Sequence, residues 1–358
     1  MLQALGHVTE SANLRSALAD VGGVDTRWLE TIQYDESGLV EQLPGLPAFV
    51  RAGARGLLEV RQTLRQWPAD VLFFNPQNAA MFCQWYMWRL PTILMTDATP
   101  IQHDAMADKY QHTPDRNPAV RALKHRANML NFHLARAVVP FCTWVRDSLV
   151  RDYGVPVERT HVLSPGIDTR RWRPAATRTS RERVRLLFVG ASLERKGGRL
   201  LLEVFRNLGL HDRAEVHLVT RDPVESAAGV FAYHGLQSNS SDLIELYQQA
   251  DVFVLPTLAD CFPNAALEAT AAGLPVISSD LAGLPDIVEH GHNGYLLDPG
   301  DGRALGAALC SLIDDAQRRR AFGQAARERA VARFDSRTNA ARMVALARAV
   351  HLEHAGRA

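Results

Sequence analysis

The sequence ADVFVLPTLADCFPNAALEATAAGLPVISSDLAGLP, residues 250–285, decides the fold class of this chain. Its first part, residues 251–256, is a short apolar run with β-branched side chains, which is typical of a buried strand in a parallel sheet. After a polar loop, residues 263–264 open a helix that ends at Gly273, and residues 275–278 form the next apolar run. The stretch therefore predicts a strand–loop–helix–strand unit.

Two acids on this unit are placed to bind one ligand. Asp260 lies in the loop at the carboxyl end of the predicted strand, and Glu268 follows in the helix. Between them, the N–H groups of Asn264, Ala265 and Ala266 lack a partner within the helix and form an anion site. An anion site between two acids suits a ligand with a phosphate in the middle and hydroxyls at both ends, and a nucleotide-sugar fits that description. The simpler alternative is that the acids only cap the helix and complement its dipole.

The residues around the acid pair favour the first interpretation. DCFPNAALEATAAGLPVI, residues 260–277, resembles the donor-site motif of glycosyltransferase family 4, the retaining enzymes of the GT-B fold. The first acid of that motif is usually Glu and is Asp260 here. The resemblance implies that Asp260 holds hydroxyls of the transferred sugar and that Glu268 accepts hydrogen bonds from the ribose.

The composition is that of an ordinary globular protein of about two domains. The chain has 358 residues, of which 47% are hydrophobic and 22% charged. Its net charge of +1 provides no bulk attraction for nucleic acid, so no nucleic-acid partner is expected. Only three of the 40 basic residues are lysines, Lys109, Lys124 and Lys196. A retained lysine is therefore stronger evidence for function in this chain than any single arginine.

The four cysteines, Cys83, Cys142, Cys261 and Cys310, lie far apart and lack metal-ligand spacing. Cys83 and Cys142 have apolar surroundings and are expected in the core, whereas Cys261 is expected as a loop thiol beside the acid pair. We interpret this usage as that of a reducing compartment. Residues 1–10 lack the pattern of a signal peptide, and no run of about 18 apolar residues exists, so we expect a cytoplasmic protein.

The first half of the chain alternates strand-like and helix-like segments, which predicts parallel βαβ units. Residues 69–74 and 91–97 are predicted strands, and residues 78–89 between them are a predicted aromatic helix that is largely buried. Ligands bind at the carboxyl ends of such strands. The candidate acceptor-side residues at these positions are His7, Asn75 and Asp97. The alternative for each is a polar residue that only caps the next helix. Family 4 enzymes often have His in the loop where this chain has Asp97.

Residues 116–136 interleave basic and apolar side chains at helical spacing. The simpler interpretation is a surface helix whose apolar side packs on the sheet. The alternative is peripheral contact with an anionic membrane, at the inner face of the cell membrane. Family 4 includes membrane-peripheral enzymes, so the resemblance keeps this alternative open.

The second half opens with a predicted strand, residues 184–190, that ends in Gly190. The absence of GxGxxG and GxxxxGK[ST] there argues against a dinucleotide oxidoreductase and a P-loop NTPase. Instead, Arg195 and Lys196 precede two glycines at a predicted helix start, where cations and free N–H groups converge. Taken alone, this arrangement of Arg195 and Lys196 fits a basic surface turn as well as it fits an anion site. The Lys-Gly pair is similar to the family motif whose lysine holds the donor diphosphate. Many members have arginine where this chain has Ala191, and Arg195 is expected to supply that charge.

SPGID, RKGG, DCFPNAALEA, GLPVI and HNG occur in the order of the family motifs. Together they predict an α/β protein of the GT-B fold, with two doubly wound Rossmann-like domains facing across a cleft. The predicted parts are an acceptor-side domain, a polar linker, a donor-binding domain and a final helix that packs back on the first domain: residues 1–173, 174–183, 184–335 and 336–358.

The resemblance implies a retaining glycosyltransferase that moves a sugar from a nucleotide-diphosphate sugar, such as a UDP-sugar or GDP-sugar, to an acceptor hydroxyl. The acceptor is a glycan, a lipid or a small molecule. Neither cofactor nor metal is expected, because cationic side chains do the electrostatic work of a metal. The catalytic candidates are Asp260, Lys196, Arg195 and Asp97. The expected donor-binding residues are Gly190, Arg195, Lys196, Leu236, Asp260, Phe262, Pro263, Asn264, Ala265 and Glu268.

Two alternatives differ from this function. One is an enzyme of the same fold with other chemistry, such as a nucleotide-sugar epimerase, which would need a base deep in the cleft. The other is a non-catalytic protein that keeps the donor domain and has lost the function of the first domain. The short N-terminal segment, Asp97 and Ala191 motivate the second alternative.

Overall fold

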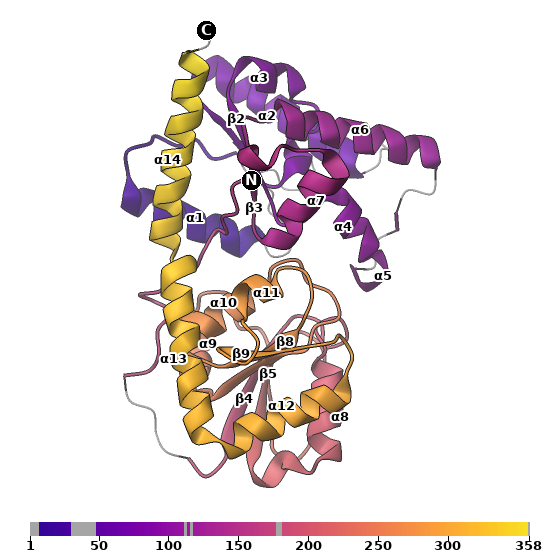
Figure 1. The fold of residues 1–358 in the computed structure, drawn as a ribbon, viewed down its shortest axis with the longest axis vertical. Helices are drawn as coiled ribbons and strands as arrows, with labels where there is room; N and C mark the ends of the chain where they lie inside the picture. The colour runs from indigo at the N-terminus through magenta and orange to yellow at the C-terminus, as the bar shows by residue number, and fades with distance from the viewer. Residues whose placement is uncertain (1–6, 30–47, 111–112, 115–116, 177–180, 357–358) are drawn as a thin grey trace. The chain divides into compact units, whose positions relative to one another are not determined.

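A computed structural model describes residues 7–29, 48–110, 113–114, 117–176 and 181–356 (Figure 1). The chain divides into two compact units. Unit 1 comprises Met1–Ala107, His112–Pro165 and Arg337–Ala358, and unit 2 comprises Asp108–Gln111 and Gly166–Ser336. In the part of the chain that the structure describes, no helix is long and apolar enough to cross a membrane.

Unit 1 is built on a parallel sheet with the strand order β1-β2-β3, in which the strands are Leu72–Phe74, Thr92–Thr96 and Ala137–Pro140. Phe73 pairs with Ile93, and Met95 pairs with Val139. All residues of β2 and β3 are buried. This burial explains why their sequences are continuous apolar runs without alternation, since helices cover both faces of a parallel sheet.

The helices of unit 1 are α1 (His7–Val21), α2 (Ala48–Gln66), α3 (Gln84–Arg89), α4 (Pro100–Ala105), α6 (Pro118–Leu134), α7 (Thr143–Tyr153) and α14 (Ser336–Ala355), with short 3₁₀ turns at Gln77–Ala80 and Val157–Arg159. The helix α5 (Ala107–Tyr110) lies mostly in unit 2. In Figure 1, α14 is drawn in yellow beside α1. Arg337 Nε donates to Asp20 Oδ2 at 2.8 Å, and Asn339 Nδ2 donates to the carbonyl oxygen of Ser164 at 3.1 Å. These bonds tie the last helix of the chain to α1 and to the end of the segment His112–Pro165 of unit 1.

The predicted buried helix at 78–89 is wrong in extent and in burial. The structure has a 3₁₀ turn at Gln77–Ala80 and then the short helix α3. Cys83 and Met87, four positions apart, face the core, while Trp85 and Trp88 point outward with exposed fractions of 55% and 69%. Aromatic content alone misled the prediction, because only one stripe of a helix faces the core.

Unit 2 is a six-stranded parallel sheet with the order β6-β5-β4-β7-β8-β9. The strands are β4 (Val184–Val189), β5 (Ala214–Val219), β6 (Val230–Tyr233), β7 (Val252–Leu255), β8 (Val276–Ser279) and β9 (Gly294–Leu297). The chain fills one side of the sheet, returns to the middle and fills the other side, as in the doubly wound Rossmann order. The topological switch point therefore lies between β4 and β7, and ligands of such sheets bind at the carboxyl ends of the strands there.

The helices of unit 2 are α8 (Gly198–Asn207), α9 (Ser241–Gln249), α10 (Asn264–Ala271), α11 (Leu284–Ile287), α12 (Gly302–Asp314) and α13 (Ala316–Arg333), with a 3₁₀ turn at Leu210–Asp212. Residues 166–173 also pack in this unit, although the domain boundary expected from the sequence lies at 173. Arg327 donates to the carbonyl oxygens of Thr169 and Trp172, both at 2.8 Å. The expected linker 174–183 includes residues 177–180, which lie outside the described residues.

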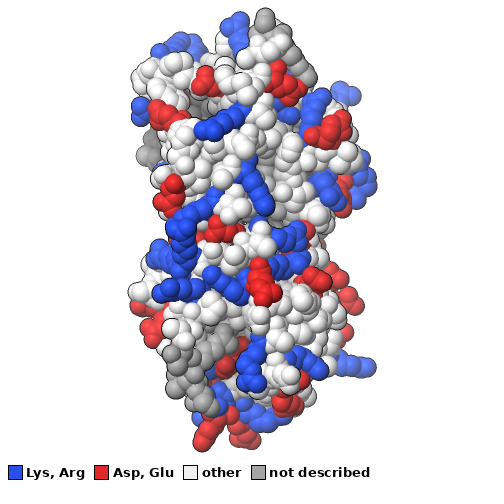
Figure 2. Space-filling view, turned by 60° about the vertical axis from the view of Figure 1, so that its left-hand side comes forward, with Lys and Arg blue, Asp and Glu red and all other residues white. Residues whose placement is uncertain are grey.

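Basic and acidic side chains are interspersed over the face that Figure 2 shows. The presence of both signs on this face fits the net charge of +1.

Candidate functional site

The switch point of unit 2 brings two loops together. The loop after β4 leads through Gly190 to α8, and the loop after β7 leads to α10. The Leu258 N–H donates to the carbonyl oxygen of Arg195 at 2.8 Å, and the Arg195 Nη1 donates to that of Ala259 at 2.9 Å. Thr257 Oγ1 has one proton and lies 3.1 Å from the carbonyl oxygen of Ala259 and 3.2 Å from that of Arg195. Segments about 60 positions apart in the sequence thus form one rigid rim.

Gly197 is required at this contact. Its φ is +76°, in the left-handed region that glycine favours. A Cβ added there would lie 2.6 Å from the carbonyl carbon of Pro256 and closer still to its oxygen. The glycine after Lys196 therefore lets the two loops touch, which explains the Lys-Gly pair in physical terms.

Lys196 and Asp260, which the sequence analysis named separately, are direct partners. Lys196 Nζ donates to Asp260 Oδ2, and only 14% and 11% of the two side chains are exposed. An ammonium has three donors and a carboxylate has about four acceptor positions. The ion pair therefore leaves two N–H donors and several carboxylate lone pairs for a ligand.

The start of α10 differs in one detail from the expectation. Pro263 precedes the helix and makes no side-chain cap, but the Ala266 N–H donates to the Pro263 carbonyl oxygen at 3.1 Å. The prediction that the Ala266 N–H is without a partner is therefore wrong, because the first turn tightens toward a 3₁₀ bond. The anion site at this helix is expected to use the N–H groups of Asn264 and Ala265.

Glu268 lies inside unit 2 with 5% of its surface exposed. Burial raises the pKa of its carboxyl to about 7, and a hydrogen bond from Tyr247 opposes that rise. Tyr247 Oη donates to Glu268 Oε2 at 2.8 Å. Tyr247 was not predicted from the sequence as a residue of the site. The available signal was its spacing of four from Leu243 on one face of α9, which places a hydroxyl in the core, where it needs a partner.

Tyr110 was also not predicted from the sequence as a residue near the site. It belongs to the segment Asp108–Gln111 of unit 2. The Arg195 guanidinium lies 4.7 Å from the centre of its ring, and its hydroxyl lies 3.8 Å from Cys261 Sγ. Burial, and next the Cys261 and Asp260 side chains, raise the pKa of the Tyr110 hydroxyl. Cys261 is thus a buried thiol at the rim of the site.

The remaining donor-side candidates lie around this rim or beyond it. Phe262 is buried and packs edge-on against Phe334, with 6.2 Å between the ring centres. Pro263 is buried beside it. Leu236 is half-buried after the edge strand β6, two strands away from β4.

The acceptor-side candidates lie in unit 1. Asn75 follows β1 and is 1% exposed, and the structure gives neither Nδ2 nor Oδ1 of its side chain a hydrogen-bond partner among the described residues. Asp97 is half-buried directly after β2, at the same edge of the sheet. His7 is the first residue of α1, and its side chain lies outside the described part.

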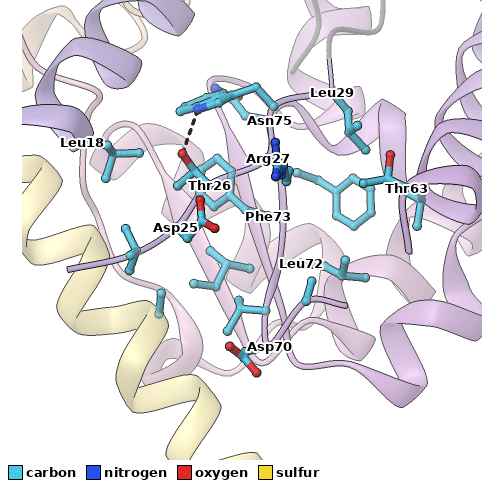
Figure 3. Close-up of a pocket in the computed structure, with 18 of the residues that line it drawn as sticks. Leu18, Asp25, Thr26, Arg27, Leu29, Thr63, Asp70, Leu72, Phe73 and Asn75 are labelled. Carbon is cyan, nitrogen blue, oxygen red and sulfur yellow. Dashed lines mark hydrogen bonds between the residues drawn. The ribbon is translucent and has the colours of Figure 1, made fainter. Parts of the chain in front are cut away.

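Asn75 lines a cavity of about 520 Å³ within unit 1, bounded by α1, α2, β1 and α14 (Figure 3). Most of the surrounding side chains are apolar, such as Leu14, Leu18 and Val344. On one wall, the Trp28 indole N–H donates to Thr26 Oγ1 at 3.0 Å, which is the dashed line in Figure 3. Among the described residues, no group of three or more His, Cys, Asp or Glu side chains could hold a metal ion.

Two family models match this chain, one in each half. The model described as Glycosyltransferase Family 4 matches residues 21–171, and the model described as Glycosyl transferases group 1 matches residues 183–315. Each half of the chain thus matches a glycosyltransferase family model. The second match contains Lys196, Asp260 and Glu268, and the first contains Asn75 and Asp97.

The chain is similar to the MMP alpha-(1->4)-mannosyltransferase of Mycolicibacterium hassiacum, with 31% identity over 211 residues. The match covers 56% of this chain and 51% of the mannosyltransferase, so the chain spans about half the length of that curated relative.

Solved glycosyltransferase structures confirm the predicted GT-B fold. Sucrose-phosphate synthase from Thermosynechococcus elongatus superposes with a TM-score of 0.74 at 18% identity, covering 98% of this chain and 94% of that one. Anabaena HepE, solved in complex with UDP and glucose, has a TM-score of 0.64 at 16% identity, with 96% and 97% covered.

Proposed function

We propose that this chain is a retaining glycosyltransferase of family 4 that uses a nucleotide-diphosphate sugar. The observation that carries the proposal is the rim of unit 2, where Lys196, Arg195 and Asp260 meet beside the start of α10 at the topological switch point. This unit combines two cations and free helix N–H groups, which suit a diphosphate, with two carboxylates, which suit the hydroxyls of a sugar and a ribose.

The cationic part of the rim binds the diphosphate in this proposal. Lys196 keeps its bond to Asp260 and directs its two other N–H donors at phosphate oxygens, together with the N–H groups of Asn264 and Ala265. The same groups stabilise the charge that develops on the leaving phosphate, which is the largest electrostatic contribution open to such a site. No metal or cofactor takes part.

The two carboxylates bind the ends of the donor. Asp260 accepts hydrogen bonds from sugar hydroxyls near the reacting carbon, and Glu268 accepts hydrogen bonds from the ribose. The bond between the sugar C1 and the phosphate oxygen breaks while the acceptor oxygen bonds to C1 on the same face. The leaving phosphate oxygen takes the proton of the acceptor hydroxyl, so no separate general base is needed.

The first experiment is a thermal-shift panel of UDP-, GDP- and ADP-sugars on the full chain. HepE, with its bound UDP and glucose, supports placing UDP-glucose first. One donor is expected to raise the Tm of wild type by mass action and to have no effect on Lys196→Ala. Lys124→Ala, a lysine of α6 in the other unit, is the matched control and keeps the shift.

Transfer is then tested with that donor and a set of acceptors, and the anomeric configuration of the product is read by NMR. Retention supports the proposal, and inversion contradicts it. A donor shift without transfer or hydrolysis favours the non-catalytic binding protein. Epimerised donor without transfer favours the epimerase. No shift with any donor contradicts a working donor site.

We also propose that unit 1 contacts an anionic membrane. Trp85 and Trp88 on α3 and Leu123 on α6 are exposed, the last at 68%, and exposed Arg121 and Arg126 lie close by on α6. The two helices are linked by the hydrogen bond from Gln84 Nε2 to Asn131 Oδ1, 2.8 Å long. Aromatic and aliphatic side chains flanked by arginines suit the headgroup region of an anionic bilayer.

The membrane proposal is tested by co-sedimentation with phosphatidylglycerol and phosphatidylcholine vesicles. Wild type is expected to bind the anionic vesicles only, and the double variant Trp85→Ser, Trp88→Ser is expected to lose that binding. Leu208→Ser, at an exposed leucine of unit 2, is the control. Equal behaviour of wild type and the double variant contradicts the proposal.

A further inference from the structure

The hydrogen bond between Tyr247 and Glu268 joins two helices inside unit 2. Tyr247 lies on α9 and is fully buried, and Glu268 lies on α10. The causes of the shifted Glu268 pKa are burial and this one hydroxyl. From α13, the neighbour of α10, Arg327 donates to the carbonyl oxygen of Ala271 at 2.7 Å. Among the described residues, Tyr247 thus provides the side-chain hydrogen bond to Glu268.

The ring of Tyr247 has little freedom to move. It packs edge-on against Trp172, with 5.1 Å between ring centres and 88° between planes, and stacks on Phe253 at 5.7 Å and 17°. The Trp172 indole is fixed in turn, since its N–H donates to Asn239 Oδ1 at 3.1 Å. A hydroxyl on a ring clamped in this way has a fixed position, which is what a supporting side chain requires.

The same hydroxyl reaches the first turn of α10. Tyr247 Oη lies 3.2 Å from the carbonyl oxygen of Ala265, whose N–H belongs to the proposed diphosphate site. A hydroxyl has one proton, so it donates mainly to the closer and ionisable partner, Glu268, at 2.8 Å. One side chain thus touches both the expected ribose acceptor and the helix turn expected to bind phosphate.

We propose that Tyr247 is a positioning residue for the donor: it holds Oε2 of Glu268 so that Oε1 is presented to the ribose hydroxyls. This inference rests on the proposed function. Tyr247 does not touch the substrate, and it acts through Glu268. The hydrogen bond favours the ionised carboxylate, which is the form that accepts two ribose hydrogen bonds.

The test compares Tyr247→Phe with Tyr295→Phe in the full chain. Tyr295 is in the same unit, and its hydroxyl is paired with Ser311 Oγ at 3.0 Å, so it controls for the loss of one hydroxyl. We expect Tyr247→Phe to raise the donor KM about tenfold with little change in kcat, as for a lost bond to a charged group. The pH midpoint of donor affinity is expected to move upward, because a bond that stabilised the ionised carboxylate is gone. Tyr295→Phe is expected to change neither.

A double-mutant cycle separates this role from general packing. If Tyr247 acts through Glu268, Tyr247→Phe has no further effect on donor KM in the Glu268→Gln background. Additive effects overturn the proposal, as do an unchanged KM and pH midpoint in Tyr247→Phe. Failure of Tyr247→Phe to fold would show a structural role and also overturn it. If wild type binds no donor, the proposed function itself fails, which is a different outcome.

Discussion

Replacement of Gly197 by alanine tests the contact between the two loops of the candidate site. The φ of +76° costs an L-residue about 1–2 kcal/mol. The added Cβ also cannot remain 2.6 Å from the Pro256 carbonyl carbon, so the loops must separate. Separation breaks the bond from the Leu258 N–H to the Arg195 carbonyl oxygen and the bond from Arg195 Nη1 to the Ala259 carbonyl oxygen, about 0.5–1.5 kcal/mol each. The expected loss of unfolding free energy is about 2–5 kcal/mol.

Gly209→Ala provides the matched control. Gly209 is also in unit 2 and has a φ of +59°, but nothing lies within 4 Å of the Cβ that alanine would add. Its expected loss is about 1–2 kcal/mol, from backbone strain alone. The assay is urea denaturation of the full chain followed by circular dichroism, with donor-induced stabilisation as a second readout. We expect Gly197→Ala to lose the donor response and Gly209→Ala to keep it. Equal destabilisation by the two variants would refute the argument from the loop contact.

Three further predictions concern unit 2. Because burial raises the pKa of Glu268 to about 7, donor affinity measured by calorimetry is expected to rise about tenfold from about pH 6 to about pH 8; a flat profile would exclude Glu268 as the ribose acceptor. Between pH 4.5 and about pH 7 the Glu268 carboxyl binds more protons in the folded chain than in the unfolded chain, so it lowers the free energy of unfolding as the pH rises through that window. Glu268→Gln is therefore expected to have a higher Tm than wild type at about pH 8, together with weaker donor binding. A lower Tm would contradict the destabilising effect of a buried charge. Arg327→Ala removes the donor to three carbonyl oxygens and is expected to lower the free energy of unfolding, measured by urea denaturation, by about 3 kcal/mol. Arg320→Ala, at an exposed arginine of the same helix, is expected to lower it by less than about 0.5 kcal/mol. Similar losses in the two variants would show that the three bonds contribute little.

Local patterns were sufficient to predict the elements of the candidate site. The stretch from β7 to β8 contains its own strand, loop and helix signals, so the fold class and the places of Asp260 and Glu268 follow from residues close in sequence. The order of the motifs also indicated the GT-B fold, which the solved structures confirm. The roles of these residues toward a donor stay predictions.

Interactions between distant segments could not be predicted in the same way. The partner of Glu268 is 21 positions away on another helix, and Tyr110 is 151 positions from Cys261. The packing of residues 166–173 in unit 2 depends on Arg327, more than 150 positions later. The outward direction of Trp85 and Trp88 depends on which side of a short helix meets the core. Each outcome is set by tertiary packing, for which a single sequence has no local signal.

The scarcity of lysine makes Lys196 a natural reporter for limited proteolysis. A lysine-specific endoproteinase has only three sites in this chain, after Lys109, Lys124 and Lys196. The peptide bond after Lys196 joins it to Gly197, which packs closely against Pro256, and the Lys196 side chain forms an ion pair with Asp260. Cleavage there requires the loop to open, so the rate at which the 196–197 bond is cut measures the local opening free energy of the rim. Fragment masses from one digest would thus follow the dynamics of the candidate site without any label.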